Sequence, residues 1–166
     1  EDLPFDSYGE TKRIGEKMAM QAKAAGVAVH IVRPFSGYGE DQSTDFPFGA
    51  FVERARKRED PFKIWGNANQ IRDFVHIDDI TAGILAIIDN DCQEPVNLCT
   101  GVGTPMIDLA RMCASVAKYV PDYEVDENAP MGVFYRVGDT TLFHSIYEPK
   151  ISLMQGVKRA LGNSLP

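Results

Sequence analysis

Two residues near the start of the sequence, Tyr8 and Lys12, have the types and the spacing to share one chemical task. Residues four apart on a helix stand on the same face, and apolar residues follow at helical spacing through Ala25. A free tyrosine titrates at about pH 10, and a neighbouring cation stabilises the phenolate. Such a tyrosine can take a proton from an alcohol while a hydride leaves the carbon.

The alternative interpretation of this pair is structural. Many helices carry a half-buried tyrosine beside a solvated lysine, and a Tyr-x-x-x-Lys match is weak when it stands by itself. The remainder of the sequence therefore has to decide between a catalytic and a structural pair.

Length and composition indicate one globular domain with a real core, because 44% of the 166 residues are hydrophobic and 25% are charged. The net charge of -7 argues against a nucleic-acid surface. No apolar run is long enough to span a bilayer, so we expect a cytoplasmic protein without a membrane partner. Three cysteines and three histidines lack metal-ligand spacing; we expect no metal site, and free thiols.

Strand and helix patterns alternate along the chain, which predicts an α/β fold with a largely parallel sheet. Residues 27–32 are nearly continuous in β-branched and apolar types, as in a strand buried on both faces. The other expected strands are 62–65, 71–77, 96–99 and the edge strand 123–125. The expected helices are 8–25, 48–57, 80–88, one that runs to about residue 120, one that Thr140 caps and that ends at Ile146, and 153–161.

Two helix starts carry specific expectations. Residues 78–79 are both aspartate and are expected to cap the helix that follows. Residues 101–103 (GVG) begin like a dinucleotide fingerprint, but Met106 stands where its third glycine would be. We therefore expect a strand-to-helix turn, with Thr104 as N-cap and Pro105 at the first helical position.

Five segments follow one another in a characteristic order. They are the Tyr-x-x-x-Lys motif, residues 33–39 (RPFSGYG), residues 65–79 (WGNANQIRDFVHIDD), residues 96–98 (VNL) and the Arg-x-x-Asp of residues 136–139. Taken in order, they resemble the second half of an extended short-chain dehydrogenase/reductase, the group of NAD(P)-dependent nucleotide-sugar epimerases, dehydratases and reductases. The resemblance extends over essentially the whole chain and includes some similarity to GDP-mannose 3,5-epimerases.

The resemblance implies roles for residues at the cofactor. Tyr8 would be the catalytic base or acid at the sugar alcohol. Lys12 would hold the nicotinamide ribose and favour the phenolate of Tyr8. The backbone around Pro34 and Phe35 would line the nicotinamide. The cofactor implied is NAD, with NADP as the alternative.

The resemblance also implies a nucleotide-diphosphate sugar as substrate. Arg72 and Arg136 would grip its diphosphate, because a planar guanidinium binds two oxygens at once. Asp139 would accept a hydrogen bond from a ribose hydroxyl. Ser36 stands where the family has asparagine, and its hydroxyl can still bond a phosphate oxygen.

The resemblance implies a division of the chain as well. Residues 1–45 would end a dinucleotide-binding domain, and residues 46–166 would form mostly a smaller substrate-binding region, with a return to the main sheet near 77–100. The family's glycine-rich loop precedes its tyrosine and is not among these residues. We therefore expect the parent protein to be the enzyme and this chain to be inactive by itself.

Three alternatives stay open. Arg72 can instead pair with Asp73 or Asp78 as a structural ion pair. The chain can be a non-catalytic fragment that dimerises, as family members commonly do through the helix carrying the Tyr-Lys pair. The parent protein can also be a reductase of something other than a nucleotide sugar.

Overall fold

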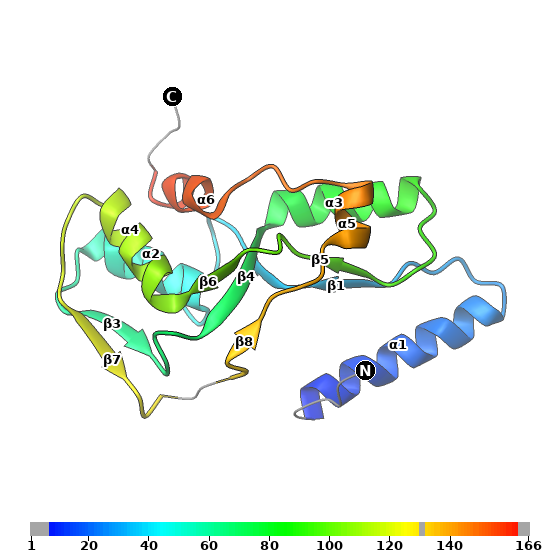
Figure 1. Cartoon of the computed structure of the whole chain (residues 1–166), viewed down its shortest axis with the longest axis horizontal. Helices are drawn as coiled ribbons and strands as arrows, with labels where there is room; N and C mark the ends of the chain where they lie inside the picture. Colours follow the sequence, from blue (N-terminus) through cyan, green and yellow to red (C-terminus); the bar gives the residue numbers. More distant parts are fainter. Residues whose placement is uncertain (1–6, 130–131, 163–166) are drawn as a thin grey trace.

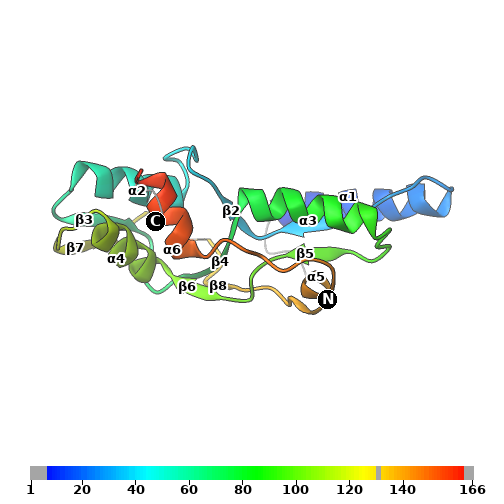
Figure 2. The same ribbon diagram turned by 90° about the horizontal axis from the view of Figure 1, so that it is seen from above.

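A computed structural model describes residues 7–129 and 132–162. The longest of the described strands, β4 (Ile71–His76), joins two parts of an elongated molecule (Figure 1). The β3–β7 pair lies at one end of the molecule, and the β1–β5 pair lies on the other side of β4 in both views (Figures 1 and 2). The remaining strands are β1 (Val32–Pro34), β2 (Ser36–Tyr38), β3 (Phe62–Trp65), β5 (Val96–Leu98), β6 (Gly103–Pro105), β7 (Tyr123–Asp126) and β8 (Tyr135–Arg136). The helices are α1 (Ser7–Ala24), α2 (Pro47–Lys57), α3 (Ile77–Asp89), α4 (Met106–Val116), α5 (Thr141–Ile146) and α6 (Leu153–Ala160).

Most strand pairs are parallel, which confirms the expected α/β class. β1 pairs with β5, β2 with β4, β3 with β7 and β8 with β4, all in parallel. β6 alone among the described strands runs antiparallel, against β4. β4 therefore has partners from three other segments, and it is the element on which the distant parts of the chain meet.

One hydrophobic core lies between α2, β3, α4 and α6. Phe48 and Phe51 of α2 are buried in it together with Phe62 of β3, Leu109 of α4 and Val157 of α6. Proline at the first position of α2 suits a helix start, because the missing N–H would have no helical partner there. The apolar periodicity predicted this helix and the strand that follows it.

A second core joins α3 and α5 to β5. It contains Ile87, Leu98 and Phe143, none of which is exposed to solvent. α3 has glycine at position 83 where it crosses Phe143, and a Cβ there would lie 2.7 Å from the Phe143 ring. The absence of a side chain therefore allows α5 to pack directly on α3.

The predicted strand 27–32 is wrong in extent. Only Val32–Pro34 form β1, and residues 27–31 are not buried. Among the described residues β1 pairs with β5 alone. Residues 27–31 lack the cover on both faces that a doubly buried strand requires. Proline has no N–H to donate to a neighbouring strand. β1 tolerates Pro34 because the hydrogen bond to the Leu98 C=O, at 3.1 Å, comes from the N–H of Phe35.

Both predicted helix caps are also wrong. α3 begins at Ile77 and its N-cap is His76, whose Nδ1 accepts from Asp78 N–H at 3.1 Å. α4 begins after Pro105, which is its N-cap, and ends at Val116 instead of near residue 120. Residues 103–105 pair with β4 as β6, so tertiary pairing moves the helix start beyond the expected turn. Thr140 does precede α5, although its side chain makes no capping bond.

Although its sequence position indicates a cap, Asp79 does not cap α3 but accepts hydrogen bonds from a distant segment of the chain. Its buried carboxylate accepts from Tyr147 Oη at 2.7 Å, Lys150 N–H at 3.0 Å and Ile151 N–H at 2.9 Å. Burial, and then this hydrogen bond, raise the pKa of Tyr147 to about 12. Asp79 thus ties the segment between α5 and α6 to α3.

We expect Asp79→Ala to lower the free energy of unfolding by about 3 kcal/mol or more, because three donors lose a charged acceptor. Urea unfolding followed by circular dichroism measures the change. Asp89→Ala, at an exposed position of the same helix, is the control and should stay within about 0.5 kcal/mol of the parent. Equal effects of the two substitutions would show that Asp79 is not an anchor.

Candidate functional site

The structure brings Tyr8 and Lys12 together on α1. The Lys12 Nζ lies 5.2 Å from the centroid of the Tyr8 ring, as the four-residue spacing predicts. Tyr8 is 68% exposed, and Lys12 is exposed too. Both polar ends are therefore open to a ligand, which speaks against the half-buried structural pair.

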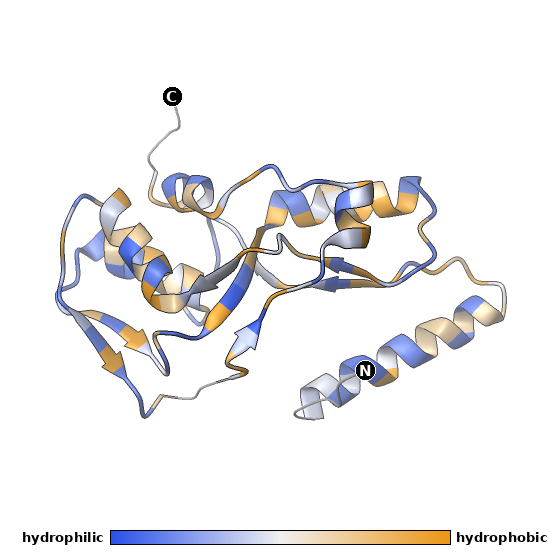
Figure 3. Cartoon of the chain, in the orientation of Figure 1, coloured by the Kyte–Doolittle hydropathy of each residue, from blue (hydrophilic) through white to orange (hydrophobic). Residues whose placement is uncertain are grey.

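α1 is held to the sheet by a few polar contacts. None of its residues is buried, and apolar positions recur along it between hydrophilic ones (Figure 3). Arg33 donates from Nε and Nη2 to the two carboxylate oxygens of Glu16 at 2.7 and 2.6 Å, and these bonds lower the pKa of Glu16. Because Arg33 lies in β1 beside Pro34, it fixes the Tyr-Lys helix relative to the predicted cofactor-lining segment.

The residues that follow Arg33 lie where the chain changes partners. Pro34 is in register with Leu98 of β5, whereas Ser36 is in register with Phe74 of β4. Phe35 stands between the two pairings. Pro34, Phe35 and Ser36 therefore lie at the carboxyl end of β1, where a parallel sheet divides and ligands of α/β proteins bind.

Arg72 and Arg136 are direct neighbours across the β4–β8 pair, in register. Burial, and then the charge of Arg136, lower the pKa of Arg72. Arg72 donates from Nη1 to the C=O of Ile71 at 2.8 Å. Within residues 7–129 and 132–162 neither arginine forms an ion pair.

The alternative ion pairs of Arg72 are not formed. Asp78 binds Arg159 at 3.1 Å. Asp73 is fully buried and accepts from Thr100 N–H and Oγ1 at 2.8 and 2.6 Å, from Gly101 N–H at 2.9 Å and from Gly138 N–H at 3.3 Å. Its carboxylate is thus occupied by donors that hold loops in place.

Asp139 is exposed and accepts from Thr141 N–H at 2.8 Å. The Thr141 side chain, and then this N–H, lower the pKa of the Asp139 carboxyl. The bond from Gly138 N–H to Asp73 fixes the chain one residue earlier. Gly138 also packs on Cys99, since a Cβ at this position would lie 2.5 Å from the Cys99 Sγ. Asp139 is therefore held close after β8, the strand that carries Arg136.

Sequence reasoning missed two positioning residues, Arg33 and Asp73. Arg33 belongs to the motif of residues 33–39. Its bond to Glu16 joins residues 17 positions apart on different elements, so local pattern does not indicate it. Asp73 follows Arg72 directly, so a local ion pair is the simplest expectation. A signal for Asp73 was its place directly before the apolar residues Phe74 and Val75, because an aspartate inside a buried strand needs several donors.

The orientation of α1 bears on how these groups relate. The N-terminal end of α1, which carries Tyr8 and Lys12, is the end nearer to β8 in Figures 1 and 2, and its C-terminal end lies farther away. The Tyr-Lys pair is therefore on the end of α1 that lies nearer to the strand of Arg136. The two arginines are on separate elements, β4 and β8.

Comparison with known proteins places the chain in a family. Its residues 1–99 match the NAD dependent epimerase/dehydratase family. It is 30% identical over 161 residues to UDP-glucuronic acid decarboxylase 1 of Arabidopsis thaliana, and 29% identical over 170 residues to GDP-mannose 3,5-epimerase of the same plant. The matches cover 94% and 93% of this chain, but 37% and 43% of the two relatives.

Solved structures agree with the fold. UDP-glucuronic acid 4-epimerase from Bacillus cereus, in complex with UDP-glucuronic acid and NAD, matches 98% of this chain and 54% of its own with a TM-score of 0.86 at 24% identity. dTDP-glucose 4,6-dehydratase from Bacillus anthracis matches 98% and 53% with a TM-score of 0.87 at 16% identity. The Rossmann-like α/β class expected from the sequence is thereby confirmed.

The chain therefore belongs to the NAD dependent epimerase/dehydratase family. It spans less than half the length of the two plant relatives. Within the described residues, no helix combines the length and the apolar character needed to cross a bilayer.

We expect Asp73→Ala to release the segment that carries Arg136 and Asp139, because Gly138 N–H and the Thr100 loop lose their common acceptor. Hydrogen exchange of amides 133–139 should become at least about tenfold faster, the effect of losing about 1.4 kcal/mol of local stability. Asp126→Ala is the control, since Asp126 is exposed on β7 and, among the described residues, its carboxylate accepts a hydrogen bond only from the nearby Asn128 N–H. Unchanged exchange in Asp73→Ala would remove Asp73 from the positioning role.

Proposed function

We propose that the complete protein is an NAD-dependent nucleotide-sugar epimerase or dehydratase, and that this chain supplies its catalytic base and its diphosphate-binding side chains. The observation that carries the proposal is the combination of an exposed Tyr8–Lys12 pair with two adjacent arginines that have no carboxylate partner among the described residues. The family membership supports the same reaction class.

In this proposal Tyr8 takes the proton of a sugar hydroxyl, and later returns it. Lys12, 5.2 Å from the Tyr8 ring, stabilises the phenolate electrostatically and has further N–H donors for a ribose. The chemistry that NAD supplies when bound is reversible hydride acceptance. The exposure of both side chains fits a cofactor placed against them. NADP is the alternative cofactor.

The remaining predicted residues would position the two ligands. The backbone of Pro34 and Phe35 would border the nicotinamide. Arg72 and Arg136 would each bind diphosphate oxygens, and the anion would relieve the repulsion between their neighbouring charges.

Ser36 and Asp139 would contact a phosphate and the ribose of the substrate. Ser36 would donate its hydroxyl to a phosphate oxygen, and Asp139 would accept from a ribose hydroxyl. The solved relatives in complex with UDP-glucuronic acid support a nucleotide-diphosphate sugar as the substrate class. The domain division at residue 45, the cytoplasmic location and inactivity of the chain by itself stay predictions.

A second function is favoured by a specific observation on α1, namely self-association. Ile14 and Met18 are 52% and 63% exposed on a helix that buries none of its residues. Apolar side chains in such positions support a homodimer through α1, whether the chain is a non-catalytic fragment or part of the enzyme.

We expect Tyr8→Phe to lower turnover of the complete protein at least about a hundredfold, since the general base is lost and the ring is kept. Steady-state turnover with NAD and nucleotide sugars measures this loss. Tyr119→Phe, far along the chain in the loop between α4 and β7, is the matched control and should leave turnover unchanged. A Tyr8→Phe enzyme with near-normal turnover would exclude Tyr8 as the base.

We expect the chain to sediment as a dimer at concentrations of about 10 μM and above, and the double substitution Ile14→Glu and Met18→Glu to shift it to monomer. Charges placed on an apolar contact must lose hydration when the contact forms, which opposes association. Sedimentation velocity over a range of concentrations measures the state. A parent chain that stays monomeric at the highest concentration would contradict the homodimer.

A further inference from the structure

Phe35 and Cys99 follow the ends of two paired parallel strands. The last residues of those strands, Pro34 of β1 and Leu98 of β5, are in register. The Phe35 N–H donates to the Leu98 C=O at 3.1 Å, which fixes the backbone at this point. Phe35 and Cys99 therefore stand together at the edge of the sheet where α/β proteins bind their ligands.

The segment that carries Arg136 and Asp139 meets both of these residues at Gly138. A Cβ at Gly138 would lie 2.5 Å from the Cys99 Sγ and 2.8 Å from the Phe35 Cζ, closer than real Cβ contacts. The absence of a side chain thus lets the segment approach the sheet this closely. One point of contact joins the segment that would border the nicotinamide to the segment that would bind the substrate.

Cys99 binds this segment as well as packing on it. Its thiol is fully buried, and the Sγ lies 3.5 Å from the C=O of Asp139 and 3.6 Å from that of Asn97. A thiol is a weak donor while it keeps its proton. Burial, and then the charge of Asp73, raise the pKa of the Cys99 thiol to about 11. At neutral pH the S–H is therefore present and can be donated to Asp139.

Three hydrogen bonds hold Asp139 and the peptide before it. The Gly138 N–H donates to Asp73 at 3.3 Å, the Asp139 C=O accepts from Cys99, and the Asp139 carboxylate accepts from the Thr141 N–H at 2.8 Å. The Asp139 side chain is nevertheless exposed. Its carboxylate is thus oriented by the protein and still accessible to a ligand.

From these contacts we propose that Cys99 is a positioning residue for the ribose contact. It orients Asp139 through the bond to its C=O, and its contact with Gly138 sets how close the Asp139 segment lies to the sheet. The Phe35 ring meets the same point, so the ribose contact is placed relative to the nicotinamide-bordering segment. The inference rests on the proposed function and deepens it, because it names the residue that makes the Asp139 acceptor effective.

The consequence of this role is measurable at the ribose. A hydrogen bond needs donor and acceptor atoms within about 3 Å and good alignment, so a small shift of the Asp139 carboxylate weakens it. Cys99→Ala removes the thiol donor and leaves space beside Gly138, which frees Asp139 to shift. Gly138→Ala acts in the opposite direction, because the added methyl group has to displace the segment from Cys99 and Phe35.

The test compares nucleoside diphosphates that have or lack the ribose hydroxyls. UDP, GDP, their 2′,3′-dideoxy forms and inorganic pyrophosphate are titrated into the 166-residue chain and followed by calorimetry. The ribose ratio is the Kd of a dideoxy form divided by the Kd of the matching ribonucleotide. This ratio reports the ribose contact, and pyrophosphate reports the diphosphate contact without it.

The variants separate positioning from general stability. They are Cys99→Ala, Gly138→Ala and Cys99→Ser, the conservative variant that keeps a donor. Cys113→Ala is the matched control, since Cys113 is also fully buried but lies in α4, within the core that joins α2, β3, α4 and α6.

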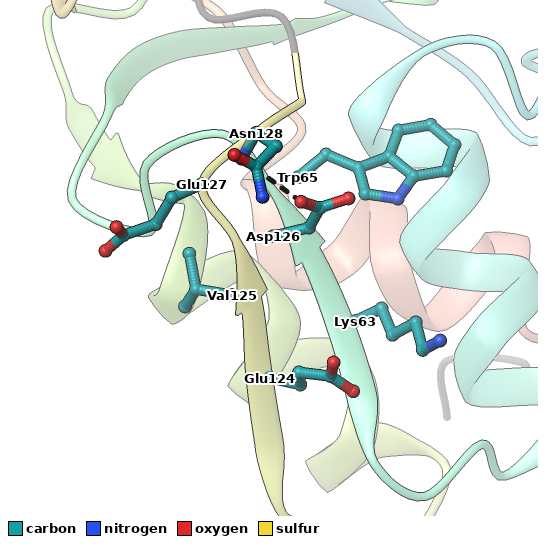
Figure 4. A pocket seen from close by; sticks show the side chains of 7 residues that line it. All are labelled: Lys63, Trp65, Glu124, Val125, Asp126, Glu127 and Asn128. Carbon is teal, nitrogen blue, oxygen red and sulfur yellow. Dashed lines mark hydrogen bonds between the residues drawn. The ribbon is translucent and has the colours of Figure 1, made fainter.

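A second pair of variants tests the acceptor itself. Asp139→Asn removes the charge of the proposed ribose contact, and Asp126→Asn is its control. Asp126 is exposed as well and also accepts from the backbone N–H two residues later, that of Asn128 at 3.1 Å. It lies in the outer hollow beside Trp65 (Figure 4), away from the contact of Gly138 with Cys99.

We expect a ribose ratio of about 10 or more for UDP, GDP or both, the effect of one hydrogen bond to a charged group. Cys99→Ala, Gly138→Ala and Asp139→Asn should each lower the ratio to about 3 or less. Cys113→Ala and Asp126→Asn should keep it, and Cys99→Ser should restore most of it. Cys99→Ala should leave the pyrophosphate affinity within about twofold of the parent chain.

Two results would overturn the inference and leave the proposed function standing. One is a full ribose ratio in a folded Cys99→Ala chain, and the other is an equal loss of the ratio in Cys99→Ala and Cys113→Ala. If Gly138→Ala does not fold, this comparison of the two cysteines decides.

The remaining results reach further. A parent chain that binds pyrophosphate but has a ribose ratio near 1 would overturn the inference together with the ribose role of Asp139, and would leave the diphosphate contact standing. Failure of every nucleotide and of pyrophosphate to bind would overturn the inference and the diphosphate proposal together.

Discussion

Two buried carboxylates six residues apart, Asp73 and Asp79, hold the last quarter of the chain against β4 and α3. Asp73 accepts from Thr100, Gly101 and Gly138. Asp79 accepts from the segment between α5 and α6. Buried ionised groups persist when several donors satisfy them, and here most donors are backbone N–H groups. The short β8 strand keeps its register with β4 because the chain on its far side is tied in this way, and the Arg72–Arg136 pair depends on that register.

The Tyr-Lys helix is positioned in a contrasting manner. α1 contributes no buried residue to either core. It is tied to the rest of the chain by the two-bond contact of Glu16 with Arg33 and by Lys23, whose Nζ donates to the C=O of Gln93. A bidentate contact fixes orientation more closely than a single point charge does. The two groups of predicted site residues are therefore held by different means. The arginines stand on a sheet stabilised by buried hydrogen bonds, and the tyrosine stands on a helix that an exposed ion pair orients.

The sequence predicted elements well where local pattern and tertiary environment agree. α2, β3, β4 and α6 begin and end within a residue or so of their expected positions, because apolar periodicity and burial coincide there. The prediction from the sequence was wrong where tertiary contacts determine the role of a residue. Asp79 resembles a cap in sequence and is used as a buried anchor, and residues 103–105 resemble a turn and are used as a strand. The pairing of Tyr8 with Lys12 follows from helix geometry, whereas the pairing of Arg72 with Arg136 depends on a register between residues 64 apart.

The balance of charge makes the unpaired arginines informative. The chain has 24 acidic and 17 basic side chains, so carboxylates are plentiful, and Arg56, Arg111 and Arg159 each pair with one. Arg72 and Arg136 lie next to each other without such a partner in the described parts of the chain, and Arg54 keeps a buried N–H without an acceptor. Cationic side chains without a carboxylate or an acceptor lower the stability of a fold. They are typical of a binding site, where a ligand supplies the missing partner.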